Sequence, residues 1–563
     1  MSRRVAPLGL LAALLLSLAG AGCGSSPSSS ASIAPPPSGG GGGGSNDGGF
    51  GGLSTDGGAT TDGGTIVVDP GDGGTTPDGG TVSDGGPATD GGTTPDGGTT
   101  VDAGVPDGPL GGGDWLQYRH DPTGCSSNAG VFTADDARSL TATGGFEVTI
   151  GDNFSTGESV VSQPLVTADT IYVTTAFGGR VLALDTSPGT KTEAQRTRWS
   201  QTFNSAVGAM GPQGFWAAPA IAGGVLYAAA ADGRIHALNA ATGAELWSVA
   251  VADPSVAAHG EFIETSPAVS VALGKLYVGI ATSDKHDPIN GKVASVDLAT
   301  HAVRIVPVVP AGLHGGSVWA SISIDEAADR IYAATGNHLD PIEQEPLSQS
   351  IIAFDAQTLD VLDHWQNPTA LNNSDFGSSP ALFEAADGTK LIAASSKDGW
   401  LYAFRRESLA AGPVWKRQLA VVDPAAPTEG GDPTAGFGSI VSPTFAHGTL
   451  FAAGGRTPGG DVGSVVALDP ATGALKWSAP HVTAGYVMTA MAAVGDVLIV
   501  ESNSGGHAIS SLEILDQATG AQLKRIDGTV AAYGAPSVGH GMVVWIDAAG
   551  HAQGLVAPRL RGP

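Results

Sequence analysis

The most constraining feature of this chain is a short phrase that recurs, in degraded form, about eight times along its second half and middle. Its clearest copy, Leu226–Trp247, carries a Tyr, an Asp-Gly turn, an alternating Ala-Leu-Asn stretch, a Thr-Gly turn and a Trp, in that order. A fixed period of this kind is typical of repeat architectures, in which each unit buries its apolar face against its neighbours. The chain is therefore predicted to be a repeat array, and functional residues are expected where repeats meet.

Each repeat predicts four strands: a short apolar strand after a Pro, a strand ending near Tyr, an alternating strand, and a strand that carries Trp. Four antiparallel strands are the content of one β-propeller blade. The complete repeats are Pro164–Trp199, Pro219–Trp247, Pro267–Val306, Trp319–Trp365, Pro380–Trp415, Pro443–Trp477 and Met488–Leu523. An eighth repeat begins at Pro536, but the sequence ends before its fourth strand.

Residues 138–150 have the pattern of an outer strand, with Phe146 to Ile150 at its end, yet no repeat precedes them. If this strand completes the eighth blade, both ends of the propeller pair and no open sheet edge remains between the first and last blades. We therefore predict an all-β, eight-bladed β-propeller of four-stranded antiparallel blades over residues 114–563, closed by pairing of both termini. A seven-bladed ring is the alternative.

Residues 23–113 are mostly Gly, Ser, Thr, Pro and Asp, with an Asp-Gly-Gly phrase repeated at intervals. A segment with so little apolar surface cannot offset its chain entropy, so it is predicted to be a disordered tether. As a Gly-rich coil it would span roughly 50 Å. The Asp-Gly phrases lack the nine-residue period of calcium-binding β-rolls, which favours a plain spacer.

Residues 1–22 have the organisation of a signal peptide, with Arg3 and Arg4 before an apolar run and small residues before Cys23. This predicts export and work outside the cytoplasm. The segment before Cys23 resembles a bacterial lipobox, although Gly20 stands where that pattern has Leu. Two processing routes follow: acylation of Cys23, which would anchor the protein to a membrane, or cleavage after Ala21, which would release it.

The chain carries 26 basic and 54 acidic residues, a formal net charge of −28. Such a surface repels phosphate backbones, so nucleic acid is excluded as an expected partner. No segment after residue 18 is apolar for long enough to span a bilayer, so membrane contact is expected through the lipid alone.

Two sets of residues recur once per repeat, and both are expected to serve structure. The tryptophans are predicted to pack blade against blade (Trp199, Trp247, Trp415 and Trp477). The aspartates that end the alternating strands are predicted to cap the following turns (Asp185, Asp297, Asp355, Asp469 and Asp516).

The Ala-Leu-Asn-Ala-Ala-Thr-Gly-Ala-Glu-Leu-Trp phrase that ends at Trp247 is similar to the repeat of the pyrroloquinoline quinone (PQQ) propeller superfamily. This resemblance covers nearly all of residues 114–563. The superfamily has a branch of quinoprotein dehydrogenases that oxidise alcohols, and a branch of noncatalytic lipoproteins such as the outer-membrane protein assembly factor. The repeat alone does not choose between them.

Motifs outside the repeat consensus resemble the dehydrogenase branch. Gly315-Gly-Ser-Val-Trp319, followed by Thr335-Gly-Asn337, resembles the quinoprotein segment whose Trp lies flat under PQQ and whose Asn binds calcium. By this resemblance Trp319 would be the floor of the cofactor site and Asn337 a ligand of Ca²⁺.

In the next blade, Asp375-Phe-Gly-Ser-Ser-Pro380 resembles the segment of the quinoprotein catalytic aspartate. Asp375 would act as the general base that takes the alcohol proton. Lys397-Asp-Gly-Trp-Leu-Tyr402 matches the position where the family places a cation on the quinone oxygens of PQQ. A cation there would stabilise the negative charge that develops on reduction.

Other family features differ. Counting back from Gly291 places His286 where the family has a calcium-binding carboxylate, so Asp287 is the expected ligand if the loop shifts; Ser283 fits a cofactor hydrogen-bonding position in the same loop. The adjacent-cysteine disulfide of many relatives has no counterpart near Met210–Phe215, where Phe215 or Trp216 could cover the cofactor ring. The chain has no Cys-x-x-Cys-His haem motif, so an enzyme would need an external electron acceptor.

The resemblance thus implies an exported, lipid-anchored propeller of the cell envelope that binds PQQ and calcium and oxidises an alcohol or polyol. The alternative is a noncatalytic scaffold on the outer membrane that binds a protein partner. The sequence leaves open whether the protein is an enzyme.

Overall fold

Prolines mark the start of six of the eight innermost strands, because a residue without an N–H is tolerated at the first position of a strand but not in its middle. The computed structural model describes residues 110–561, with gaps at 152–159, 161, 177, 204–213, 256–259, 283–289, 482–484, 505–509 and 529–533. The predicted signal peptide, Cys23 and most of the predicted tether lie outside the described residues.

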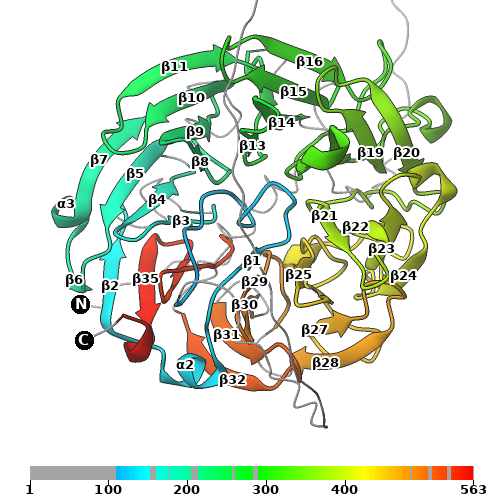
Figure 1. Cartoon of the computed structure of the whole chain (residues 1–563). Coiled ribbons are helices and arrows are strands. Elements are labelled where there is room, and N and C mark those ends of the chain that lie inside the picture. Colours follow the sequence, from blue (N-terminus) through cyan, green and yellow to red (C-terminus); the bar gives the residue numbers. More distant parts are fainter. Residues whose placement is uncertain are drawn as a thin grey trace, which may run out of the picture. The chain divides into compact units, whose positions relative to one another are not determined.

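The described residues form eight mainly antiparallel sheets arranged as the blades of a ring (Figure 1). Blade 1 consists of β3 (Leu165–Val166), β4 (Thr170–Thr174), β5 (Arg180–Asp185) and β7 (Thr197–Thr202). Blade 2 consists of β8 (Ala220–Ala222), β9 (Val225–Ala229), β10 (Arg234–Asn239) and β11 (Glu245–Ala250). Blade 3 consists of β13 (Ala268–Ser270), β14 (Lys275–Thr282), β15 (Lys292–Asp297) and β16 (Val303–Pro307), and β12 (Glu261–Phe262) also pairs with β14.

Blades 4 to 6 repeat the same order. Blade 4 consists of β17 (Ser323–Asp325), β18 (Arg330–Ala334), β19 (Ser350–Asp355) and β20 (Val361–Gln366). Blade 5 consists of β21 (Ala381–Glu384), β22 (Lys390–Ser395), β23 (Trp400–Arg405) and β24 (Trp415–Gln418). Blade 6 consists of β25 (Thr444–Ala446), β26 (Thr449–Gly454), β27 (Gly463–Leu468) and β28 (Leu475–His481).

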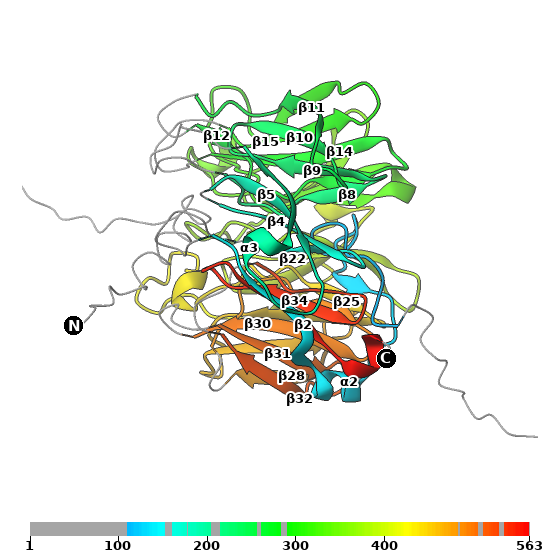
Figure 2. The ribbon, with the colours of Figure 1, turned by 90° about the vertical axis from the view of Figure 1, so that its left-hand side faces the viewer.

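Blades 7 and 8 close the ring. Blade 7 has β29 (Ala492–Val494), β30 (Val497–Asn503), β31 (Ser510–Asp516) and β32 (Gln522–Asp527), with β1 (Ser127–Asn128) parallel to β29. Blade 8 has β33 (Ser537–Gly539), β34 (Met542–Ile546), β35 (His551–Val556) and β2 (Thr141–Thr149), with β6 (Gly189–Thr190) beside β2. Two short helices lie outside the sheets: α2 (Ala134–Ser139) contacts β32 of blade 7, and α3 (Glu193–Arg196) contacts β2 of blade 8 and β5 of blade 1 (Figure 2).

Pairing of the two ends is confirmed. The strand β2 lies antiparallel to β35, with Phe146 opposite Gly554 and Thr149 opposite His551. Gly554 fits there because a Cβ at this position would lie 2.3 Å from Cε1 of Phe146. The eighth blade therefore takes its outer strand from the N-terminal side, and the seven-bladed alternative is wrong.

The recurrent tryptophans pack between blades, as predicted. Trp199 donates its indole N–H to Ala240 O of the next blade at 2.9 Å, and Trp477 does the same to Gln517 O at 2.9 Å. Each indole also lies against the Gly of the neighbouring Thr-Gly turn, Gly243 or Gly520, where a Cβ would approach the ring to 2.6 Å or less. Glycine at these turns is therefore required for the blades to meet.

The aspartates at the ends of the alternating strands cap turns, also as predicted. Oδ1 of Asp355 accepts hydrogen bonds from the backbone N–H groups of Gln357 and Thr358, and Asp469 does the same for Ala471 and Thr472. These carboxylates therefore serve as turn caps.

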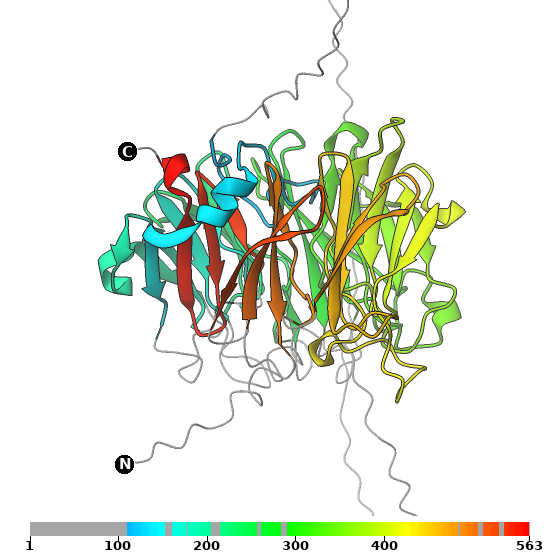
Figure 3. The ribbon, with the colours of Figure 1, turned by 90° about the horizontal axis from the view of Figure 1, so that it is seen from below.

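The N-terminal segment, residues 111–128, crosses one face of the ring and contacts all eight blades (blue in Figure 3). It bonds to the innermost strands in order around the ring, and to the turn that follows β33. The pairs are Trp115–Val166, Leu116–Ile221, Gln117–Val269, Pro122–Ile324, Thr123–Leu382, Cys125–Phe445, Ser126–Ala493 and Gly111–Gly541. Residues 111–113, which the sequence assigns to the tether, thus hydrogen-bond to the propeller.

Arg119 fixes this segment over the channel. Its guanidinium is 1% exposed and donates to Ser379 O at 2.8 Å, to Pro380 O at 3.0 Å and to Pro443 O at 3.3 Å. Its backbone N–H donates to Oε1 of Gln163 at 2.8 Å, and Gln163 in turn donates to Pro536 O at 2.7 Å. Arg119 therefore joins blades 5 and 6 through its side chain, and blades 1 and 8 through its backbone N–H and Gln163.

Candidate functional site

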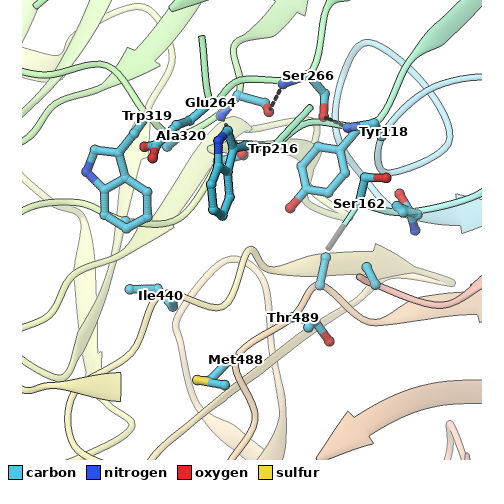
Figure 4. Close-up of a pocket in the computed structure, with 17 residues that line it drawn as sticks. Tyr118, Ser162, Trp216, Glu264, Ser266, Trp319, Ala320, Ile440, Met488 and Thr489 are labelled. Atoms are coloured by element: carbon cyan, nitrogen blue, oxygen red, sulfur yellow. Dashed lines mark hydrogen bonds between the residues drawn. The ribbon is translucent and has the colours of Figure 1, made fainter. Parts of the chain in front are cut away.

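The central channel holds a cavity of about 170 Å³ that every blade helps to line. Figure 4 shows Trp216, Trp319 and Tyr118 around it, together with Glu264 and Met488. Tyr118 comes from the N-terminal segment, which therefore closes one end of the cavity. Glu264 is the only charged residue among those that line it, so the described wall is mostly aromatic, apolar and hydroxyl in character.

Serines on consecutive blades form a hydrogen-bonded belt around this cavity. The backbone N–H of Ser266 donates to Oγ of Ser321 at 2.9 Å, Ser321 N to Ser379 Oγ at 2.8 Å, and Ser379 N to Ser442 Oγ at 2.9 Å. Each hydroxyl thus satisfies a backbone donor that the innermost strand leaves unpaired. The sequence analysis did not single out these serines, although Ser before Pro recurs in the repeats as a visible signal.

Three of the predicted site residues come together beside the cavity. The indole N–H of Trp319 donates to Oδ2 of Asp375 at 2.8 Å, and Nζ of Lys397 lies 3.0 Å from Oδ1 of the same carboxylate. Nζ of Lys397 also lies 5.1 Å from the centroid of the Trp319 ring. Trp319 precedes β17, Asp375 precedes β21 and Lys397 follows β22, so the site joins blades 4 and 5.

Burial makes this contact strong. The Lys397 and Asp375 side chains are 5% and 1% exposed, whereas Trp319 remains half-buried at the cavity wall. The backbone N–H of Lys397 also donates to Asp375 O at 3.1 Å, which fixes the two segments against each other. At a buried site the effective dielectric constant is lower than in water, so the attraction between these two charges is stronger than it would be at the surface.

Gly377 provides the space in which Trp319 lies. A Cβ at Gly377 would come within 2.4 Å of Cη2 of Trp319 and 2.5 Å of Cγ2 of Ile440. The indole therefore packs directly on the backbone two residues after Asp375. This contact explains why Gly follows Phe376 in the motif that carries the aspartate.

Asn337 lies close to the same segment but reaches it through another side chain. Nε2 of Gln349 is 3.3 Å from Oδ1 of Asn337, 3.3 Å from Oγ of Ser374 and 3.0 Å from Leu371 O. Asn337 is 6% exposed and Gln349 is fully buried. Gln349 was not predicted from the sequence; it links the predicted ligand Asn337 to the residue before Asp375.

The remaining predicted residues cannot be placed. Ser283, His286 and Asp287 fall in the gap at residues 283–289, and Cys23 precedes residue 110, so all four lie outside the described residues. Phe215 is buried and packs in the core between blades 1 and 2, whereas Trp216 lines the cavity. Of the two candidates for covering a cofactor ring, Trp216 is therefore the one on the channel.

The described residues fit a planar quinone better than they fit calcium. A half-buried indole on the channel, with an ammonium group above its face and a carboxylate at its edge, presents stacking surface and a cation for quinone oxygens. In contrast, both oxygens of Asp375 already have partners, and the described part of the chain has no group of three or more His, Cys, Asp or Glu placed to hold a metal.

An eight-bladed ring with this channel site defines a propeller of the PQQ-like superfamily. The chain belongs to the family described as outer membrane protein assembly factor BamB, whose profile matches residues 136–408 and 397–557. No helix among the described residues is both long and apolar enough to cross a membrane.

Two curated proteins are similar to parts of the chain. A polyvinylalcohol dehydrogenase of Sphingopyxis is 24% identical over 33% of this chain and 34% of its own length. A serine/threonine-protein kinase, AfsK of Streptomyces griseus, is 33% identical over 26% of this chain and 17% of its own length. The chain thus spans about a third of the length of the first relative and less than a fifth of the second.

Among solved structures, the quinohemoprotein alcohol dehydrogenase of Comamonas testosteroni is similar over 80% of this chain and 81% of its own, with a TM-score of 0.60 and 18% identity. A europium-containing methanol dehydrogenase is similar over 77% and 88%, with a TM-score of 0.56 and 18% identity. At this identity the likeness establishes the shared fold.

Proposed function

We propose that this protein is an exported quinoprotein-like dehydrogenase that binds PQQ together with Ca²⁺ and oxidises an alcohol or polyol. The observation that carries the proposal is the buried contact between Lys397 and Asp375, with Trp319 donating to the same carboxylate. A buried ion pair contributes little net stability compared with apolar packing, so its presence beside the channel favours a chemical role.

Each of the three residues has a role that follows from its position. Trp319 offers the face of its indole to a planar ligand, and Lys397 holds a positive charge above that face. PQQ, when bound, supplies the hydride acceptor. Asp375 would accept the alcohol proton. For this, the ammonium group of Lys397 would turn from Asp375 toward a quinone oxygen, which would free the carboxylate to act as a base.

Calcium is assigned to the side of the site where Asn337 lies. Asn337 would supply an amide oxygen and Asp287 a carboxylate, both of the hard type that Ca²⁺ prefers. Ser283 would bond to the cofactor from the loop that carries Asp287. Electrons would leave through an external acceptor, because the sequence has no haem-binding motif.

A separate proposal, based on the sequence, is that the protein is anchored to the outer membrane. Acylation of Cys23 would attach the protein to the outer membrane, and the segment between Cys23 and Leu110 would act as the tether. Residue 110 lies at the face that the N-terminal segment closes, so the chain enters the propeller on that side. Substrate would then enter the channel from the opposite face.

The function is tested with the full mature chain, mixed with PQQ in the presence and absence of Ca²⁺, by following dye reduction with methanol, 2-propanol and polyvinyl alcohol. We expect turnover with at least one alcohol. Asp375→Asn should still bind PQQ, as measured by quenching of Trp fluorescence. Its turnover should be about 100- to 10,000-fold lower than that of the wild-type protein. Asn337→Ala should weaken binding that depends on Ca²⁺.

Asp469→Asn is the matched control, because it makes the same change at a turn cap in blade 6, away from the channel. It should leave both readouts unchanged. If the wild-type protein neither binds PQQ nor reduces the dye, the enzyme proposal is wrong.

That negative outcome would support a second function, which the BamB description of the matching family favours. In that case the propeller is a noncatalytic scaffold that binds a protein partner at the outer membrane. A pull-down from envelope extract, compared between the wild-type and Asp375→Asn proteins, would then show a partner that does not depend on the channel site.

A further inference from the structure

The cavity of about 170 Å³ lies between Trp319 and the N-terminal segment. In blade 4 the chain runs from Trp319 through Ser321 into β17, where the backbone N–H of Ile324 donates to Pro122 O of that segment at 2.8 Å. Trp319, Ser321 and, from the segment itself, Tyr118 all line the cavity. The cavity therefore occupies the part of the channel on the segment's side of Trp319.

The pair formed by Asp375 and Lys397 lies outside this cavity. In blade 5 the chain runs from Asp375 through Ser379 into β21, where the backbone N–H of Leu382 donates to the N-terminal segment at 3.0 Å. Ser379 lines the cavity, whereas neither Asp375 nor Lys397 does. Trp319, which lines the cavity and contacts both charged residues, is the wall between two separate sites.

Three buried serines, Ser266, Ser321 and Ser379, present hydroxyl groups along this cavity. Their Oγ atoms accept, in that order, from the backbone N–H of Ala218 at 3.1 Å, of Ser266 at 2.9 Å and of Ser321 at 2.8 Å. A hydroxyl group has one O–H donor besides its two acceptor lone pairs. Among the described residues none of these three O–H groups donates to the protein, so they are available to the oxygen atoms of a ligand.

The other lining residues define the kind of ligand. Figure 4 shows Trp216, Trp319 and Tyr118 around the cavity, and their rings supply apolar surface for the C–H faces of a ligand. Glu264 is the one charged residue in the described lining, and the absence of Lys and Arg there disfavours an anion. The volume is close to that of a cavity of about 150 Å³ that holds one benzene molecule, so a single six-membered ring fits.

We propose that this cavity binds a neutral, hydroxylated six-membered ring, that is, a monosaccharide or a cyclic polyol. The oxygen atoms of the ligand would accept from the serine O–H groups, while its C–H faces would pack on the aromatic side chains. This binding function goes beyond the proposed dehydrogenase activity. It does not depend on PQQ, because Asp375 and Lys397 do not line the cavity.

The test is isothermal titration calorimetry on the full mature chain in the absence of PQQ, with glucose, galactose and myo-inositol as separate probes. We expect a Kd of about 1 mM or lower for at least one of them. Glycerol has hydroxyl groups but no ring face to pack on the aromatic side chains, so it should bind at least about tenfold more weakly.

Two variants remove the two kinds of contact. Ser321→Ala deletes one O–H group in the cavity and should weaken binding of the best probe by about fivefold or more. Its matched control is Ser442→Ala, which removes the acceptor of the Ser379 N–H at 2.9 Å in the same belt but does not line the cavity. Trp216→Leu keeps an apolar side chain but removes a ring face, and should weaken binding by about tenfold or more.

Two results would overturn the proposal. The first is that none of the three probes binds at concentrations up to about 50 mM, in which case the cavity holds water only. The second is equal affinity in wild type, Ser321→Ala and Trp216→Leu, because the ligand would then bind elsewhere. A wild-type protein that binds a probe but not PQQ would contradict the dehydrogenase proposal and leave the proposed ring-binding site intact.

Discussion

Nζ of Lys397 lies 3.0 Å from Oδ1 of Asp375, with both side chains almost completely buried at the boundary of blades 4 and 5. The sequence predicts both residues, but assigns Lys397 to the oxygens of a cofactor and not to the aspartate. In the structure the lysine already has a partner, so a bound quinone would have to share the ammonium group with Asp375.

Replacement of Lys397 by Met should destabilise the protein strongly, because it removes the ammonium group that pairs with the buried carboxylate of Asp375. Removal of one partner from a buried pair costs about 3–5 kcal/mol, which urea denaturation would measure. Lys397→Arg keeps the charge and should recover most of the stability. A Lys397→Met protein as stable as the wild type would show that the pair contributes nothing.

Gly377→Ala should displace the Trp319 ring, because its Cβ would lie 2.4 Å from Cη2 of the indole. We expect a loss of about 1–3 kcal/mol in stability and at least a tenfold weaker binding of PQQ, measured by quenching of Trp fluorescence. The matched control is Gly459→Ala, where the nearest atom to the added Cβ is 3.6 Å away. Equal effects at both positions would contradict the role of Gly377.

Arg119→Lys should loosen the N-terminal segment from the ring, because an ammonium group cannot reach the carbonyls of Ser379, Pro380 and Pro443 that the guanidinium bonds together. The expected cost is about 2 kcal/mol or more, with increased proteolysis within residues 111–128. Arg198→Lys is the control: its pair with Asp169 is exposed, and the change should cost less than about 0.5 kcal/mol.

Cys125 should be unreactive in the folded protein. Burial raises the pKa of its thiol to about 11 from an ordinary value of 9.0, and its Sγ lies 2.8 Å from Leu382 O. Alkylation by iodoacetamide at pH 8 should therefore be at least tenfold slower than for the unfolded chain, and should accelerate in Arg119→Lys.

The raised pKa of Cys125 also determines how the free energy of unfolding should change with pH. Because the folded pKa of Cys125 is the higher one, its contribution to stability is complete below pH 9 and is lost as pH rises toward 11. The free energy of unfolding should therefore fall across this range, and Cys125→Ser should reduce the fall. A rapid reaction of Cys125 at pH 8 in the native protein would show that blades 5 and 6 do not shield its thiol.

Much of the fold could be predicted because the repeat encodes it locally. Pro164 and Pro380 immediately precede innermost strands, Asp355 and Asp469 cap turns, and Trp199 and Trp477 pack on the glycines of the next blade. Each of these depends on neighbours that lie one repeat apart, at a spacing that is visible along the chain. The closing strand β2 could be predicted because the eighth repeat lacked an outer strand.

The contacts that could not be predicted depend on distant residues. Nothing local in residues 111–128 indicates that they touch every blade, since that path exists only once the ring has formed. Gln349, which follows an insertion in blade 4, reaches Asn337 and Ser374. These residues have no periodic pattern that could reveal them.

The sequence by itself determined the number of blades, the closure of the ring and the identity of Trp319, Asp375 and Lys397 as candidate site residues, because repeats and motifs carry that information in spacing. Only the tertiary structure decided that Asp375 contacts both Trp319 and Lys397, and that the N-terminal segment crosses one face of the ring. The physical reason is that burial and the pairing of charges are properties of surfaces brought together by the ring, and they have no counterpart along the chain.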